Sequence, residues 1–96
     1  MKLDQTSAAT AFVLGWAYEE AGRRREAIGA WRAAATIDPT MLPAHLALAD
    51  GYMRMSERAL AEQAVRAGLT AMPGSPELQA KLAQIQGNHD HDDQLS

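Results

Sequence analysis

The stretch Leu14-Gly15-Trp16-Ala17-Tyr18 decides the fold, because part of it recurs at a fixed distance along the chain. Adding 34 to the number of Tyr18 gives Tyr52, and the same offset relates eight pairs of identical residues. The pairs are Leu14 and Leu48, Tyr18 and Tyr52, Arg24 and Arg58, Ala27 and Ala61, Ala30 and Ala64, Ala33 and Ala67, Thr36 and Thr70, and Pro39 and Pro73. One helical surface repeats every few residues, so an offset of this length indicates a repeated structural unit.

This spacing resembles the tetratricopeptide signature, which reads W-x2-L-G-x2-Y, then A-x3-F, then P. The first copy consists of Ala11, Leu14, Gly15, Tyr18, Ala27, Trp31 and Pro39, and the second of His45, Leu48, Ala49, Tyr52, Ala61, Val65 and Pro73. Ala11 and His45 replace the opening tryptophan, and Ala49 replaces the second glycine, with residues that a helix accepts. The resemblance implies an all-α fold, an α-α superhelix (solenoid) of two antiparallel hairpins and a capping helix.

Start and stop signals predict five helices. Gly22 is expected to end the first in a left-handed conformation, and Asp38-Pro39 to end the second. Capping is expected from Thr6 or Ser7, from Ser56 and from Ser75. The predicted organisation is an N-terminal extension (1–7), a first repeat (8–41), a second repeat (42–75), a capping helix (76–87) and a disordered acidic, histidine-containing tail (88–96).

Composition sets limits on function. A chain of 96 residues forms one domain and buries only about 60–65% of its unfolded surface, so a large enclosed active site is not expected. Cysteine is absent, which excludes disulfides and thiolate sites. The net charge of −3 and the lack of a basic stripe disfavour nucleic acid as a partner. The polar start of the chain lacks the apolar run of a secretory signal, and no segment is long enough to span a membrane, so we expect a cytoplasmic protein.

The packing expected of each hairpin follows from residue size. Leu14 and Tyr18 share one face of the first helix, and small residues such as Gly15 allow the helix axes to approach. Trp31 is expected to fill the remaining space as a core residue. The last helix resembles a solvating cap with Leu78, Leu82, Ala83 and Ile85 on its inner side. Nothing comparable precedes the first helix, so that edge is either bare or covered by a second protein or a second copy.

In tetratricopeptide arrays the first helix of each hairpin lines a concave groove in which ligands lie. The matching positions that we expect to bind a partner are Phe12, Trp16, Glu19, Glu20, Leu46, Asp50, Met53, Arg54 and Lys81. Apolar anchors inside a charged rim are the usual anatomy of a recognition site. The alternative is that a short, tightly curled array buries these side chains against itself.

The resemblance also indicates the kind of ligand. Relatives that bind chaperone tails hold a terminal carboxylate with lysines, asparagines and an arginine. The matching positions here are Phe12, Trp16, Ala47, Glu77 and Lys81, and only Lys81 has a suitable charge. An apolar or amphipathic segment of a partner protein therefore fits better than an acidic C-terminal peptide.

The remaining polar residues predict no chemistry. His45 is expected to be a half-buried packing residue, because no carboxylate or serine lies at catalytic spacing around it. The segment His89-Asp90-His91-Asp92-Asp93 contains metal ligands, but its polar surroundings predict a flexible tail without a specific metal site. We expect neither an enzyme nor a cofactor.

Two functions follow from these features. The first is a protein-protein interaction module, an adaptor, chaperone-like protein or regulatory subunit, that holds a peptide or helix of another protein in its groove. The alternative is a structural scaffold that self-assembles through its uncapped N-terminal hairpin, as a homo-oligomer.

Overall fold

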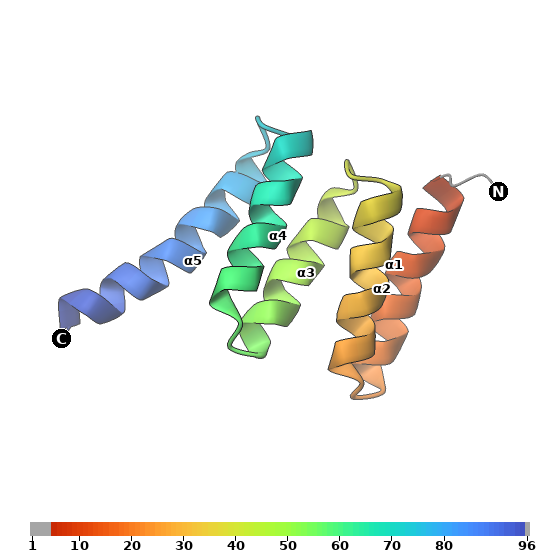
Figure 1. The fold of residues 1–96 in the computed structure, drawn as a ribbon, viewed down its shortest axis with the longest axis horizontal. Coiled ribbons are helices and arrows are strands. Elements are labelled where there is room, and N and C mark those ends of the chain that lie inside the picture. Colours follow the sequence, from red (N-terminus) through yellow and green to blue (C-terminus); the bar gives the residue numbers. More distant parts are fainter. Residues whose placement is uncertain (1–4, 96) are drawn as a thin grey trace.

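The computed structural model describes residues 5–95, and the side chains of residues 7–87. Its helices are α1 (Gln5–Glu20), α2 (Arg24–Ile37), α3 (Leu42–Arg54), α4 (Arg58–Ala71) and α5 (Pro76–Leu95) (Figure 1). Residues 5–95 contain no strand, which confirms the predicted all-α fold with five helices. Each helix packs against the next in the chain, α3 also touches α5, and the hairpins follow one another along the longest dimension of 51 Å (Figure 1).

The helix bounds follow the same offset as the identical residues. It relates both ends of α4 to the corresponding ends of α2, and the first residue of α5 to the first residue of α3. The helices α2 and α4 are rich in alanine, the best helix former, and each stops two residues before a proline, Pro39 or Pro73. The sequence therefore determines these bounds locally, before any packing is considered.

The turns after α1 and α3 have the same backbone conformation although their residues differ. Gly22 has a φ of 81°, and Ser56, the equivalent residue of the second repeat, has a φ of 61°. In the second turn the N–H of Glu57 donates to the carbonyl of Tyr52 at 2.8 Å, and the first turn has the matching bond. This hydrogen bond belongs to the Schellman motif, whose left-handed residue is usually glycine.

The three predicted caps have different outcomes. The Ser75 cap is confirmed, because its Oγ accepts a hydrogen bond from the N–H of Leu78 at 3.3 Å. The Ser56 cap is wrong, because the left-handed backbone of this residue places it in the turn before α4. The cap at residues 6–7 is also wrong, since α1 already begins at Gln5.

The core of the first hairpin is built around Trp31 of α2, which is 2% exposed, as predicted for a core filler. The indole lies over Gly15 of α1, where a β-carbon would come within 2.3 Å of its Nε1 atom. Trp31 Nε1 has no hydrogen-bond partner among the described residues, so the contribution of this side chain comes from its shape. Only glycine at position 15 allows the two helices to approach this closely.

A second core lies between α3, α4 and α5. Its buried members are Ala49, Ala61, Val65, Leu78 and Ile85. His45 is 3% exposed, more deeply buried than predicted, and its ring packs against Gly68 of α4. His45 Nε2 forms a hydrogen bond with the carbonyl of Pro39 at 2.8 Å, which satisfies one of its two buried nitrogens.

One packing prediction fails at the N-terminal end. The motif predicts Leu14 as a core residue, yet it is 45% exposed, whereas Leu48 at the equivalent position of α3 is 5% exposed. Leu48 packs in the cluster around α2. No described element lies on the corresponding side of α1, which forms the end of the molecule (Figure 1).

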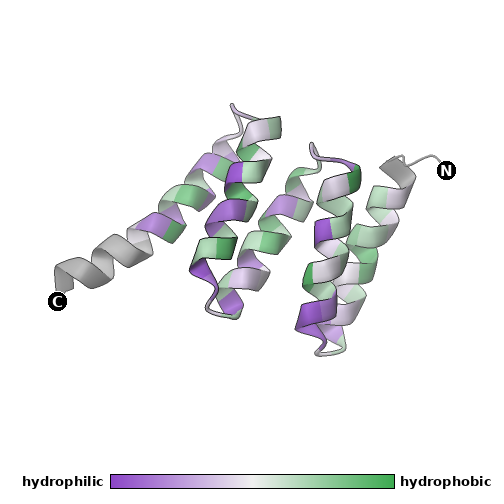
Figure 2. Cartoon of the chain, viewed as in Figure 1, coloured by the Kyte–Doolittle hydropathy of each residue, from purple (hydrophilic) through white to green (hydrophobic). Residues whose placement is uncertain are grey.

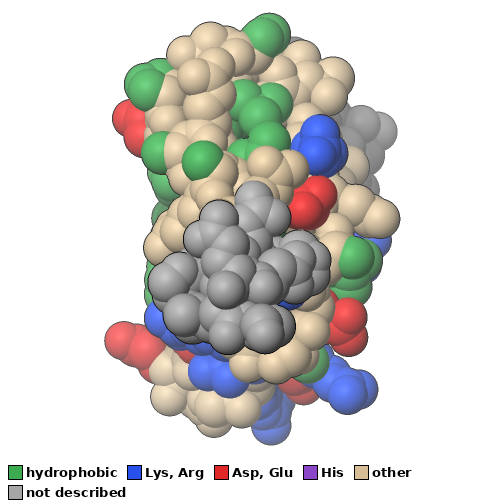
Figure 3. Space-filling view, turned by 90° about the vertical axis from the view of Figure 1, so that its left-hand side faces the viewer, with side chains coloured by type: hydrophobic (Ala, Val, Ile, Leu, Met, Phe, Trp, Pro, Cys, Tyr) green, Lys and Arg blue, Asp and Glu red, His purple; other side chains and the backbone are tan. Residues whose placement is uncertain are grey.

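The last helix closes the other end. Leu78 and Ile85 are buried and Leu82 is partly buried, whereas Ala83, expected on the same side, is exposed. From the α5 end, hydrophobic side chains gather in the upper part of the face and most Lys and Arg side chains lie lower (Figure 3). The predicted end near Gly87 is wrong, because the helix continues to Leu95. Gly87 lacks the positive φ of a helix terminator, and no proline follows it.

Candidate partner-binding face

The nine residues predicted to bind a partner lie on α1, α3 and α5. Four lie on α1, four on α3 and one on α5, in the order Phe12, Trp16, Glu19, Glu20, Leu46, Asp50, Met53, Arg54 and Lys81. These three helices alternate with α2 and α4 along the chain. The structure joins several of the nine by direct contacts, which fall into a charged set and an aromatic set.

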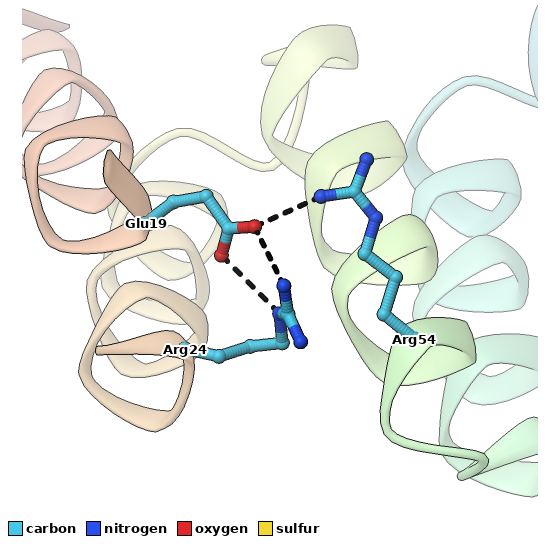
Figure 4. A network of polar contacts seen from close by, with 3 residues as sticks. All are labelled: Glu19, Arg24 and Arg54. Atoms are coloured by element: carbon cyan, nitrogen blue, oxygen red, sulfur yellow. Dashed lines mark hydrogen bonds and ion pairs between the residues drawn. The ribbon is translucent and has the colours of Figure 1, made fainter. Parts of the chain in front are cut away.

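Two ion pairs connect the three helices. Arg54 of α3 donates to Glu19 of α1 at 2.8 Å, and Lys81 of α5 donates to Asp50 of α3 at 2.9 Å. Arg24, at the start of α2, also donates to Glu19, at 3.1 Å (Figure 4). The predicted rim charges are therefore largely paired with one another.

The environment of Glu19 holds it in the ionised form. Its side chain is mostly buried between two arginines that are far more exposed. The hydrogen bond from Arg24 lowers the pKa of Glu19, opposed by desolvation, and the charges of Arg24 and Arg54 lower it further. Sequence reasoning missed Arg24, because a run of three arginines in a turn suggests solvated charges.

Three aromatic rings form a row from the surface into the core. The ring centroids of Phe12 and Trp16 are 6.3 Å apart and nearly perpendicular, and those of Trp16 and Trp31 are 5.0 Å apart. Trp16 is 44% exposed, Phe12 is partly buried and Trp31 is buried. Trp16 is thus a large exposed ring supported by two neighbours in edge-to-face contacts.

The other two apolar residues of the predicted site lie in a different environment. Leu46 and Met53 are partly buried and pack against the second core, whereas Phe12 packs against the first. The structure brings Phe12 and Trp16 into direct contact and gives Leu46 and Met53 a share in holding α3 to its neighbours. The exposed apolar surface of the predicted site is therefore concentrated at Trp16.

A groove that the sequence did not predict lies between α2 and α4, with α3 as its floor. Its volume is about 380 Å³, and it is lined by Arg32, Ala35, Thr36, Pro39, His45, Leu48, Tyr52, Leu60, Gln63, Ala64 and Ala67. The alanines of α2 and α4 leave this space open because their side chains are short. Those alanines were the only signal in the sequence, and they also suit ordinary helix packing.

Other kinds of site find no support in the described part of the chain. Its residues include no group of three or more side chains able to hold a metal ion. The segment 89–93, with its histidines and aspartates, lies outside the described side chains. Among residues 5–95, no helix is both long enough and apolar enough to cross a bilayer.

Comparison with known proteins adds no relative: no family model matches the chain, and no curated protein sequence is significantly similar to it. The resemblance to tetratricopeptide proteins rests on the motif residues and the constant offset between the two copies alone.

Proposed function

We propose that this chain is a protein-protein interaction module of the tetratricopeptide type, and that it binds an apolar or amphipathic segment of another protein on the face formed by α1, α3 and α5. The observation that carries the proposal is the 44% exposure of Trp16. Burying a tryptophan that is already held by Phe12 and Trp31 costs little conformational entropy, and such rigid aromatic side chains dominate binding energies.

The charges on the same face favour an apolar ligand segment over an acidic one. Lys81, the one residue with the charge that a carboxylate clamp needs, is paired with Asp50. Arg54 is likewise paired with Glu19. A terminal carboxylate would have to displace one of these partners, whereas an apolar side chain next to Trp16 leaves both pairs intact.

The test compares Trp16→Ala with Leu60→Ala. Both residues are exposed hydrophobics, but Leu60 lies on α4 and lines the groove between α2 and α4. A partner is first identified by quantitative mass spectrometry with the wild-type chain, and its binding segment is then titrated against each variant. We expect Trp16→Ala to weaken binding by roughly 30-fold or more, and Leu60→Ala to leave it unchanged.

Circular dichroism of both variants provides the folding control. Unchanged affinity in folded Trp16→Ala would overturn the proposed face. Loss of binding in Leu60→Ala alone would move the site to the groove between α2 and α4.

A second candidate, self-assembly through the N-terminal hairpin, is favoured by a separate observation. Val13 and Leu14 on α1 are 65% and 45% exposed, which places two adjacent branched aliphatic side chains in solvent. Contiguous apolar surface of this kind often marks a protein interface. Light scattering over a range of concentrations tests this function, and a constant monomeric mass would reject it.

A further inference from the structure

The outer face of α1 is the least protected apolar surface in the described part of the chain. Of the four large hydrophobic residues that are exposed there, Val13, Leu14 and Trp16 lie on α1, and Leu60 lies on α4. Residues three or four apart share one side of a helix. The side of α1 that contains Leu14 consists of Thr10, Val13, Leu14, Ala17, Tyr18 and Ala21, and none of them is charged.

The equivalent face of α3 shows what such a surface can bury. The matching residues of the second repeat are Ala44, Ala47, Leu48, Gly51, Tyr52 and Met55. The first four are buried and the last two are partly buried, in contact with the core around α2. At Gly51, a β-carbon would come within 3.0 Å of Ile28 and 3.2 Å of Trp31, so α2 lies directly against this face. The α1 face therefore has the pattern of a helix-packing surface without a covering helix.

The opposite end of the molecule is a poor complement for this face. The exposed positions on the described part of α5 are polar or alanine, and they include Gln79, Ala80, Ala83, Gln84 and Gln86. The apolar side chains visible from this end are confined to the upper part of the view (Figure 3). In contrast, the middle of α1 is coloured mainly as hydrophobic (Figure 2). The best match for the α1 face is thus the same face of a second copy.

We propose that two copies of this chain pair through the outer faces of their α1 helices, antiparallel and related by a two-fold axis. This inference rests on the self-association candidate above, and it replaces open-ended assembly by a closed dimer. It is independent of the proposed binding face, because Trp16 is not among the residues that pair.

Charge complementarity determines the direction of the pairing. The described charges of α1 are Glu19 and Glu20 at its C-terminal end, and its first turn has no acidic residue. Glu20 is exposed and makes no ion pair with the described side chains. An antiparallel arrangement places Glu20 beside the N-terminus of the partner helix, where the helix dipole favours a negative charge. A parallel arrangement would bring four glutamates together.

The size of the face determines the expected strength. Stable interfaces bury roughly 800 Å² on each partner. With about 1.5 Å per residue, the 16 residues of α1 provide a contact about 24 Å long and one helix wide, which is less than that area. We therefore expect a dissociation constant in the micromolar range or weaker, so that the dimer forms only at high concentration.

Sedimentation velocity of the full chain over a wide concentration range tests the stoichiometry and the face. We expect the mass to rise from 10.4 kDa to a plateau at twice that value. Val13→Glu and Leu14→Glu should each weaken dimerisation at least tenfold, and both positions are exposed enough for the monomer to tolerate them. Leu60→Glu, an equally drastic change on α4, is the control and should leave the dimer intact.

The other outcomes separate the two ideas. A monomer at every concentration would reject both self-association and the dimer. Growth beyond two copies would retain self-assembly and reject the two-fold pairing. A dimer that Val13→Glu and Leu14→Glu do not weaken would retain self-association and reject the α1 face.

Cysteine cross-linking tests the direction, because the natural chain has no cysteine. Thr10 and Ala21 lie at opposite ends of the α1 face. Antiparallel pairing places position 10 of one copy next to position 21 of the other, so an oxidised mixture of Thr10→Cys and Ala21→Cys should form mainly mixed disulfides. Disulfides formed mainly between identical variants would overturn the antiparallel arrangement.

Discussion

The two helical hairpins of this molecule follow nearly the same sequence pattern but differ in their surroundings. Leu14 and Leu48 are identical residues at equivalent positions, yet the first is 45% exposed and the second 5%. The hairpin of α3 and α4 has helices packed on both sides, whereas that of α1 and α2 has a neighbour on one side only. A motif residue thus contributes to the core only when an adjacent element covers it.

The hairpins also differ in how they divide the volume between their helices. In the first, glycine at position 15 accommodates the buried Trp31. In the second, the equivalent residues Ala49 and Val65 are both fully buried. The first hairpin combines the smallest residue with the largest, and the second uses two of moderate size. Both choices produce a packed interior, so the pairs rather than the single residues should be under constraint.

The largest effect should come from Leu48→Ala compared with Leu14→Ala. Removing a buried leucine side chain costs about 3 kcal/mol of unfolding free energy, because it leaves a cavity. Leu14→Ala should cost less than about 0.5 kcal/mol at concentrations where the chain is monomeric. Urea unfolding followed by circular dichroism measures both values. Similar losses in the two variants would mean that α1 is covered in the monomer.

The next effect is expected from Gly15→Ala, which places a methyl group within 2.3 Å of Trp31 Nε1. We expect a loss of about 2 kcal/mol, because a tightly packed indole cannot move aside without strain. In a Trp31→Phe background the smaller ring should accommodate the methyl group, so the two substitutions should be strongly non-additive in a double-mutant cycle. Additive losses would show that the two residues do not share one space.

A smaller effect of opposite sign is expected in the turns. Ser56→Gly should stabilise the chain by about 1 kcal/mol, because a left-handed backbone is unfavourable for serine and not for glycine. Gly22→Ser is the matched change in the other turn and should destabilise by a similar amount. Thermal unfolding of both variants provides the comparison, and equal signs for the two would contradict it.

The smallest effect concerns pH. The pKa of Glu19 is lowered in the folded state, so its stabilising contribution is present above the ordinary glutamate pKa. The contribution is lost as the pH falls through the lowered folded value. With partners this exposed, we expect roughly 0.5–1 kcal/mol at neutral pH.

Glu19→Gln should therefore be less stable than wild type at neutral pH and equal to it in acid. Glu20→Gln is the matched control, since Glu20 forms no ion pair with the described side chains, and it should not change the pH dependence. Urea unfolding at several pH values below neutrality measures both. A constant difference between Glu19→Gln and wild type would argue against a role for the ion pairs.

The sequence by itself determined the five helices, the correspondence between the two repeats and the burial of Trp31. These features depend on local propensity, on proline and serine signals, and on residue size within one hairpin, all of which can be recognised along the chain. The residues predicted for the partner-binding face also came from the motif, and their role stays a prediction.

Only the tertiary structure decided the exposure of Leu14, the ion pairs of Glu19 with Arg24 and Arg54, and the groove between α2 and α4. Each depends on which surfaces of different helices meet, or on a missing neighbour. The motif spacing gives the side of the helix on which a residue lies. Whether that side is covered is decided by the packing of whole helices.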